Sequence, residues 1–146
     1  MNIEPGTGID SVKYGIDEQE LIQLFGKPDK IDIEYEFRNL WYSPRNLYFT
    51  FKKRDNFRLG TITVMGSGYS LLGKELFGLP QNTVKRFLAK STKEIPKKLD
   101  NLTGYGDESM EHVGLSILFW FDSSDNLSEM QCGYKFETDN NSIIWP

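Results

Sequence analysis

Apolar residues follow a helical spacing in two short segments, one in each half of the chain. In the first segment, Asp17 lies three residues before Glu20, a spacing typical of the capping box that begins a helix. The residues expected on the buried side of this helix are Leu21, Ile22, Leu24 and Phe25. The second segment opens near Pro80, since proline is accepted in a first helical turn. Its expected apolar side consists of Val84, Phe87 and Leu88.

Elsewhere the period changes to two, which is typical of strands with one buried side. Each half contains two such segments joined by a polar turn, and this arrangement predicts a hairpin in each half. The paired segments are 47–51 with 59–64, and 113–121 with 127–134. Residues 8–12 predict a short first strand. The range 90–106 lacks a clear period and is expected to be a loop with one helical turn before Pro96.

A further alternating segment, residues 31–38, combines apolar and charged side chains. Ile31, Ile33, Tyr35 and Phe37 alternate with Asp32, Glu34, Glu36 and Arg38. We expect a half-buried strand whose outward side is strongly acidic. Like charges on one side of a strand repel each other and add nothing to folding that threonine would not, so this side indicates a surface for a basic partner.

The two halves repeat the same order of apolar anchors. A gapless offset of 63 residues superimposes the helical segments and places Gly15 on Gly78. An offset of 68 residues superimposes the hairpins and places Leu47 on Leu115. We expect an α+β protein in which two tandem helix-plus-antiparallel-hairpin units form one sheet with the helices packed on one face. The chain is expected to be one domain, built from repeat 1 (about 8–65) and repeat 2 (about 69–136).

Part of the first half resembles a known family. The run 12–21, the stop at Leu24-Phe25-Gly26-Lys27-Pro28, the pair Trp41-Tyr42 and the hairpin that follows are similar to the pattern of β-lactamase-inhibitor-protein-like domains. This superfamily includes the small lipoprotein of the outer-membrane barrel assembly machinery, which resembles one copy. The resemblance implies a helical segment on one face of an antiparallel sheet, an open opposite face, and function through binding of proteins.

Composition narrows the class of partner. The 17 basic and 21 acidic residues among 146 give a net charge of −4, which disfavours nucleic acid and favours a basic protein partner. A basic tract at 85–98 lacks interleaved aromatic residues and is expected to be a solvated face. The chain opens without a basic start or an apolar signal region and no run is long enough to span a membrane, so we expect a cytoplasmic protein with no membrane partner.

Chemical motifs are scarce. His112 is the single histidine and no ligand set is spaced around it, so we expect neither a metal site, nor a cofactor, nor an enzyme. Cys132 is the single cysteine, which excludes an internal disulfide. It occupies an apolar strand position and is expected to be a buried small hydrophobe rather than a reactive thiol.

Alternation also places large side chains on the outward side of the hairpins. Leu118 and Trp120 are expected to face away from the helices together with Tyr48, while cover by the 90–106 segment or the C-terminal tail is the alternative for Trp120. The candidate partner-binding residues are Asp32, Glu34, Glu36, Tyr48, Leu118 and Trp120.

These features lead to one favoured function and several alternatives. We expect a protein-binding module, most concretely an immunity protein that neutralises a cognate bacterial toxin by binding a basic toxin domain through an open acidic and aromatic sheet face. A small-ligand-binding protein or an enzyme with a pocket between sheet and helices is the competing class. A structural adaptor is the third.

Overall fold

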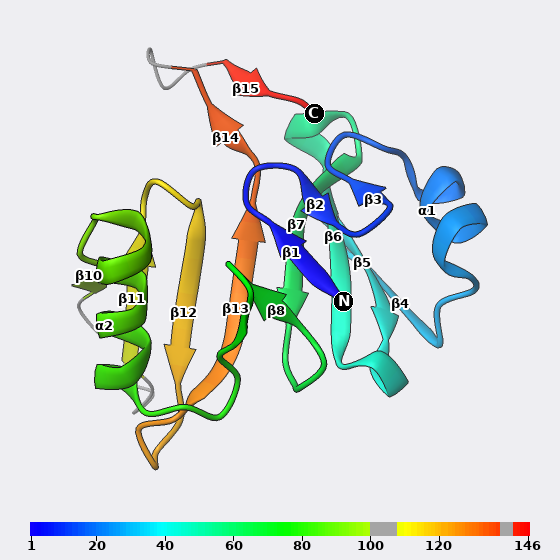
Figure 1. Cartoon of the computed structure of the whole chain (residues 1–146). Coiled ribbons are helices and arrows are strands. Elements are labelled where there is room, and N and C mark those ends of the chain that lie inside the picture. The colour runs from blue at the N-terminus through cyan, green and yellow to red at the C-terminus, as the bar shows by residue number, and fades with distance from the viewer. Residues whose placement is uncertain (100–107, 138–141) are drawn as a thin grey trace.

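The computed structural model describes residues 1–99, 108–137 and 142–146, and this part of the chain is mostly β (Figure 1). The largest element is an antiparallel sheet of eight strands. In spatial order these are β10 (Lys97–Leu99), β11 (Glu108–His112), β12 (Ile117–Phe121), β13 (Leu127–Gly133), β7 (Arg58–Val64), β6 (Leu47–Lys52), β5 (Phe37–Tyr42) and β4 (Lys30–Ile33). Two short 3-10 turns, Ser43–Arg45 and Lys53–Asp55, connect strands within the first half.

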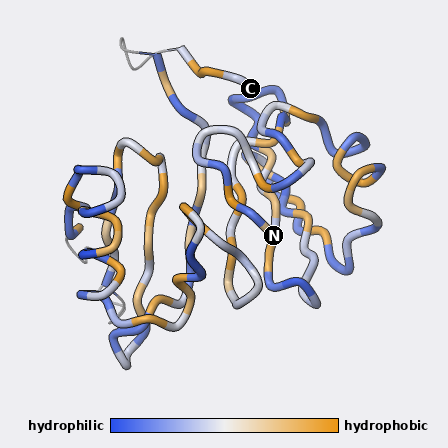
Figure 2. The backbone as a smooth tube through the Cα atoms, viewed as in Figure 1, coloured by the Kyte–Doolittle hydropathy of each residue, from blue (hydrophilic) through white to orange (hydrophobic). Residues whose placement is uncertain are grey.

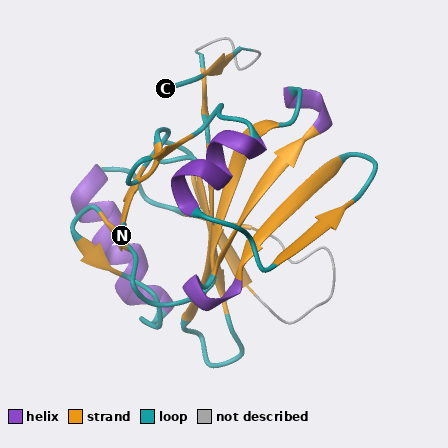
Figure 3. Ribbon diagram, turned by 90° about the vertical axis from the view of Figure 1, so that its right-hand side faces the viewer, coloured by secondary structure: helices purple, strands orange, loops and turns teal. Residues whose placement is uncertain are grey.

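Two smaller sheets accompany the main sheet among the described residues. The first has five short strands in the order β3 (Val12–Lys13), β2 (Gly8–Ile9), β1 (Asn2–Glu4), β8 (Ser70–Leu71) and β9 (Lys74–Glu75). The second consists of β14 (Lys135–Phe136) and β15 (Ile143–Ile144). The helices are α1 (Glu18–Phe25) and α2 (Gln81–Thr92), and both lie with the five-stranded sheet on the same face of the main sheet (Figures 1 and 3). Neither helix is long and apolar enough to cross a membrane.

Helix α1 begins as its sequence predicts. The side chain of Asp17 accepts a hydrogen bond from the backbone N–H of Glu20 at 2.9 Å, which satisfies one of the free donors of the first turn. Gly26 ends the helix with a φ of 96°, a left-handed conformation that glycine adopts without strain. The expected buried side is only partly right, since Leu21 is buried whereas Ile22 and Leu24 are exposed. A helix of eight residues offers room for one narrow buried stripe.

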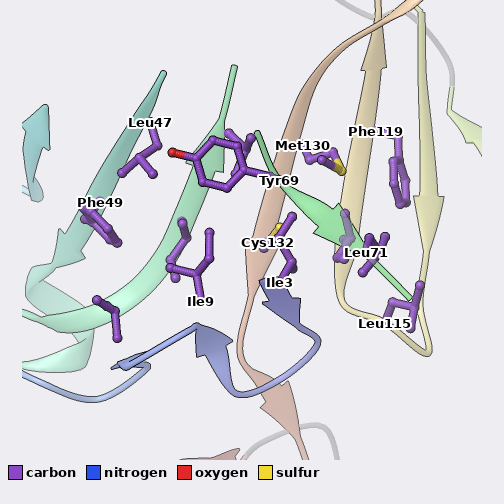
Figure 4. Close-up of a cluster of buried hydrophobic side chains, with 14 of the residues drawn as sticks. Ile3, Ile9, Leu47, Phe49, Tyr69, Leu71, Leu115, Phe119, Met130 and Cys132 are labelled. Carbon is purple, nitrogen blue, oxygen red and sulfur yellow. The ribbon is translucent and has the colours of Figure 1, made fainter. Parts of the chain in front are cut away.

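The core lies between the main sheet and the elements on its covered face (Figure 4). From the main sheet, β6 contributes Phe49 and β12 contributes Phe119, both fully buried. From the opposite layer, Ile9 and Leu71 of the five-stranded sheet point toward them. The alternation in the two hairpins therefore predicted correctly that Phe49 and Phe119 enter the core. Val113, the first residue of the expected strand 113–121, is instead 68 % exposed because it lies in the turn between β11 and β12.

The two halves of the main sheet meet where β7 pairs with β13. In this pairing, one residue of the first half lies opposite its equivalent in the second half. Thr63 lies opposite Gln131, while Ile62 pairs with Cys132 and Val64 pairs with Met130. Thr63 and Gln131 are 68 residues apart, the same offset that superimposes the two hairpins in the sequence. Strand order is also symmetric about this junction, with four strands from each half.

The expected fold class is nevertheless wrong. Each half contributes four strands to the main sheet instead of one hairpin, and additional strands form two further sheets, so the protein is mostly β instead of two helix-plus-hairpin units on a single sheet. The short strand expected at 8–12 is divided into β2 and β3, which pair with each other. The sequence did not predict β1, β8 or β9, and β1 and β8 pair across the chain. For example, Ile3 of β1 lies beside Leu71 of β8 in parallel.

The expected strand over 31–38 is also wrong. β4 ends at Ile33, and the chain reverses at residues 34–37, where the N–H of Glu34 donates to the carbonyl of Phe37 at 2.9 Å. β4 is the last strand of the sheet, so its apolar side chains have no further neighbour and are exposed instead of half-buried. The predicted loop at 90–106 contains β10, and its residues 100–106 lie outside the described part of the chain.

Candidate functional site

The face of the main sheet opposite the helices is the candidate site, and we call it the open face. Its side chains are the alternate residues of the strands, and a row of them crosses the sheet in register. The row runs from β5 to β12 through Trp41, Tyr48, Thr63, Gln131 and Leu118. Among the described elements, the helices and the five-stranded sheet all lie on the other face (Figure 3).

Trp41 and Tyr48 form a rigid aromatic platform at one end of this row. Their rings stack with centroids 4.2 Å apart, and both side chains are half-buried. The indole N–H of Trp41 donates to Asp32 at 2.8 Å, while the ammonium of Lys30 lies 5.4 Å from the Trp41 ring. Burial raises the pKa of Tyr48, which keeps its hydroxyl protonated across the neutral range. The platform is thus held in place before any partner arrives.

Leu118 and Trp120 lie on β12 of the same face, as the alternation predicts. Both are half-buried, and strand spacing puts Leu118 about 14 Å from Tyr48, three strands away. The Trp120 indole N–H is buried and bonds to none of the described residues. A hollow of about 340 Å³ beside it is lined by Met65, Trp120, Ser128, Glu129 and Gln131.

A larger groove, of about 640 Å³, occupies the other end of the open face. Its lining includes Gly60 and Gly133, and a side chain at Gly60 would meet Asp55 and the ring of Tyr134. Charged side chains of both signs line it, among them Lys52, Arg54 and Glu111. The groove lies on the face away from the helices, so a pocket between sheet and helices is not what the structure provides here.

The acidic residues gather at one corner of the sheet instead of covering its face. Asp32 is on β4 and is already engaged by Trp41 and by Lys30, the latter at 3.5 Å. Glu34 and Glu36 lie in the turn between β4 and β5 and are exposed. At the centre of the open face, Thr50 and Thr63 are packed closely enough to be buried, and Gln131 donates a hydrogen bond to the carboxylate of Glu129 at 3.2 Å. The structure therefore places Asp32 next to the Trp41–Tyr48 platform, whereas Glu34 and Glu36 lie in the turn at the corner of the sheet.

Two further residues were missed by the sequence analysis. Trp41 and Gln131 occupy the central row of the open face together with the predicted Tyr48 and Leu118. The sequence offers a weak signal for Trp41, because it stands between Leu40 and Tyr42, two apolar residues that the structure places in the core. No comparable signal existed for Gln131, whose position beside Thr63 depends on the pairing of the two halves.

His112 belongs to the covered side of the sheet and has structural partners. Its Nδ1 accepts the backbone N–H of Leu115 at 3.1 Å, and its Nε2 lies 2.8 Å from the hydroxyl of Thr92. That hydroxyl donates to the carbonyl of Leu88 at 2.6 Å, and a carboxylate oxygen of Glu94 lies 3.3 Å from Nδ1. Within the described ranges, no cluster of three or more histidine, cysteine or acidic residues is arranged to hold a metal.

Cys132 is 3 % exposed and faces the core, which confirms that it packs as a small hydrophobe. Burial raises the pKa of its thiol to about 12, so the nucleophilic thiolate is not populated near neutral pH.

The basic tract lies at the outer side of α2 and on β10. Lys85, Arg86, Lys90, Lys93, Lys97 and Lys98 are all exposed. Figure 2 shows hydrophilic and hydrophobic residues alternating along α2, which is the pattern of a helix with one solvated side.

No family model matches the chain, and no curated protein matches it. A crystal structure of an extracellular protein containing an SCP domain from Bacillus anthracis str. Ames is similar to it, with 13 % sequence identity and a TM-score of 0.49. The match covers 82 % of this chain and 43 % of that protein, so this chain spans less than half of its length. A likeness at this level assigns neither a fold nor a function to the chain.

Proposed function

We propose that this protein is a protein-binding module whose open face docks onto a partner. The observation that carries the proposal is the presence of partly exposed aromatic side chains on the open face, which no described helix or strand covers. Tryptophan and tyrosine dominate the energetics of protein interfaces, and here Trp41, Tyr48 and Trp120 are partly exposed on one face. The resemblance of residues 12–28 to β-lactamase-inhibitor-protein-like domains supports the same class of function.

The most concrete form of this proposal is an immunity protein for a bacterial toxin. The partner would be a basic toxin domain, because Glu34 and Glu36 form an exposed acidic corner beside the open face. Exposed charges of this kind raise the association rate and select the partner, whereas the aromatic residues supply affinity. A cytoplasmic location and the absence of a cofactor belong to the same proposal.

The groove supports one alternative. Its volume of about 640 Å³ falls within the range of small-molecule sites, and its lining combines apolar residues with Lys52, Arg54 and Glu111. A small-ligand-binding protein would bind its ligand in this groove, and Trp41 and Tyr48, which do not line the groove, would not contact that ligand. Binding that depends on these two aromatic residues therefore distinguishes the first proposal from the second.

The test requires the partner, which we would seek as the product of a neighbouring gene and measure by surface plasmon resonance. Trp120→Ala should weaken binding by about 2 kcal/mol, or roughly 30-fold, mainly through faster dissociation. Glu34→Lys should instead slow association, and less so at high salt, because salt screens exposed charges beyond about 8 Å at physiological ionic strength.

Lys85→Ala, on the solvated side of α2, is the matched control and should change neither rate. Unchanged affinity for Trp120→Ala, combined with a sharp loss of folding stability, would place Trp120 in the core and refute the proposal.

A further inference from the structure

The two edge strands of the main sheet, β10 and β4, differ in the side chains that they carry. β10, at one end, carries Lys97 and Lys98, and charged lysines on an edge strand oppose the addition of another strand. β4, at the other end, carries Ile31 and Ile33, whose side chains are 45 % and 68 % exposed. The molecule therefore protects one end of its sheet and presents apolar side chains at the other.

The backbone of β4 is oriented to accept a strand. Antiparallel pairs alternate between those that exchange hydrogen bonds and those that do not. The N–H of Glu34 donates to Phe37, so the pair of Ile33 with Arg38 is of the second kind, as is the pair of Ile31 with Leu40. The backbone N–H and C=O groups of Ile31 and Ile33 consequently point away from β5, toward the free edge.

The side chains of β4 specify the chemistry of the added strand. Ile31 lies on the same face as buried Leu40, whereas Asp32 lies on the open face and Glu34 follows in the turn after β4. A strand added to this edge would place alternate residues on the same two faces. Apolar residues would then lie beside the isoleucines, and basic residues would lie beside the acidic side chains.

The charge of this edge argues against a second copy of the same strand. Residues 29–36 contain four acidic side chains and one lysine. Pairing β4 with itself would bring like charges together, which destabilises cross-strand neighbours. A basic segment would instead find opposite charges along the edge.

We propose that β4 is a docking edge for an extended segment of another protein in which apolar residues alternate with lysine or arginine. Such a segment adds a ninth strand to the main sheet through backbone hydrogen bonds, and its alternating side chains give specificity. This contact uses the edge of the sheet and is separate from the docking through the open face described above.

The proposal can be tested with a synthetic peptide of alternating valine and lysine. Hydrogen exchange of the intact protein, followed residue by residue by NMR, should show the amides of Ile31 and Ile33 exchanging at least tenfold more slowly when the peptide is bound. The same peptide with every second amide N-methylated cannot complete the backbone bonds and should give no protection. A peptide of alternating valine and glutamate should also fail, because its charge opposes the acidic edge.

Variants of Ile33 separate edge pairing from general charge attraction. Ile33→Pro removes an outward N–H that β5 does not use, and edge strands tolerate proline at such positions. Its affinity for the peptide should fall at least tenfold at an unchanged melting temperature. Ile33→Lys should have the same effect and is the second variant if the proline protein does not fold. Ile33→Val retains the N–H and the apolar surface and should bind like the parent protein.

Three results would overturn the proposal. The first is equal binding of the N-methylated peptide. The second is binding that survives Ile33→Lys but is lost in Trp120→Ala, which would assign the peptide to the open face. The third is protection of Ile31 and Ile33 without peptide, together with a dimer in sedimentation, which would make a second copy of the chain the occupant. The first and third results leave the proposed docking through the open face untouched, whereas the second would move this basic ligand to that face.

Discussion

Some polar side chains of this protein are held by short hydrogen bonds between residues that are separated in the chain. Asp29 is a clear case, because its carboxylate accepts both the backbone N–H of Ser43 at 2.6 Å and the hydroxyl of Ser43 at 2.7 Å. These bonds tie the residue before β4 to the turn that follows β5. The hydroxyl and the N–H of Ser43 together hold the pKa of the Asp29 carboxyl below its ordinary value of 3.8.

This pKa shift predicts a pH dependence with a definite sign. A carboxyl whose folded pKa is lowered stabilises the protein above its unfolded pKa, here near 3.8, and the stabilisation is lost as pH falls through the lower folded pKa. Asp29→Asn should therefore lower the free energy of unfolding at about pH 6, and the difference from the parent protein should shrink as the pH falls below 3.8. Urea denaturation at several pH values measures it.

Ser43→Ala serves as the control, because it removes the hydroxyl from the same pair and should show the same trend. A constant difference between parent and Asp29→Asn across this pH range would contradict the assignment.

At the scale of elements, the burial of an apolar side chain depends on what its helix or strand packs against, even when the apolar residues are regularly spaced. Leu21 and Leu24 lie on the same short helix and both fit a helical apolar pattern. Leu21 is fully buried against the sheet, whereas Leu24 is 53 % exposed. A similar difference separates Phe49, in the middle of the main sheet, from Ile33 on its last strand.

The two leucines of α1 give a matched pair of substitutions. Leu21→Ala should cost about 2–5 kcal/mol of unfolding free energy, because it removes buried methyl groups and leaves a cavity. Leu24→Ala should cost less than about 1 kcal/mol, since little apolar surface is lost and alanine favours a helix. Chemical denaturation of both variants checks the difference. Equal effects would mean that α1 packs differently from the arrangement described here.

At the scale of the whole molecule, the two halves are joined by more than the central seam. β7 pairs with β13 in the main sheet, and β1 pairs with β8 in the five-stranded sheet. The N-terminal amine also donates to the carbonyl of Gly68 at 2.7 Å. Each half therefore supplies strands to two sheets at once, and neither half contains the whole of its own core.

This interlocking predicts that the halves do not fold alone. Fragments 1–67 and 68–146, prepared separately, should show no cooperative unfolding by circular dichroism, because each would expose an unpaired central strand and half of the core. An equimolar mixture should recover a cooperative transition, and the intact chain is the reference. Cooperative unfolding of either fragment by itself would contradict the prediction.

The sequence by itself determined features that depend on near neighbours. The capping spacing of Asp17 located the start of α1, and the alternation of residues 47–51 identified the side of β6 that enters the core. The position of Cys132 in an apolar alternation was enough to predict its burial. On the open face, alternation placed Tyr48, Leu118 and Trp120 on one side of the sheet. These features follow from helical and strand geometry, which repeats within a few residues.

Only the tertiary structure decided which strands are central and which lie at an edge. Ile31 and Ile33 have the alternation of a half-buried strand, yet they are exposed because β4 has a neighbour on one side only. Glu34 and Glu36 lie in a turn. Gln131 belongs to the same row of the open face as Tyr48 because it pairs with Thr63. The period of a strand specifies the side to which a residue points, whereas what lies on that side depends on pairing between residues far apart in the chain.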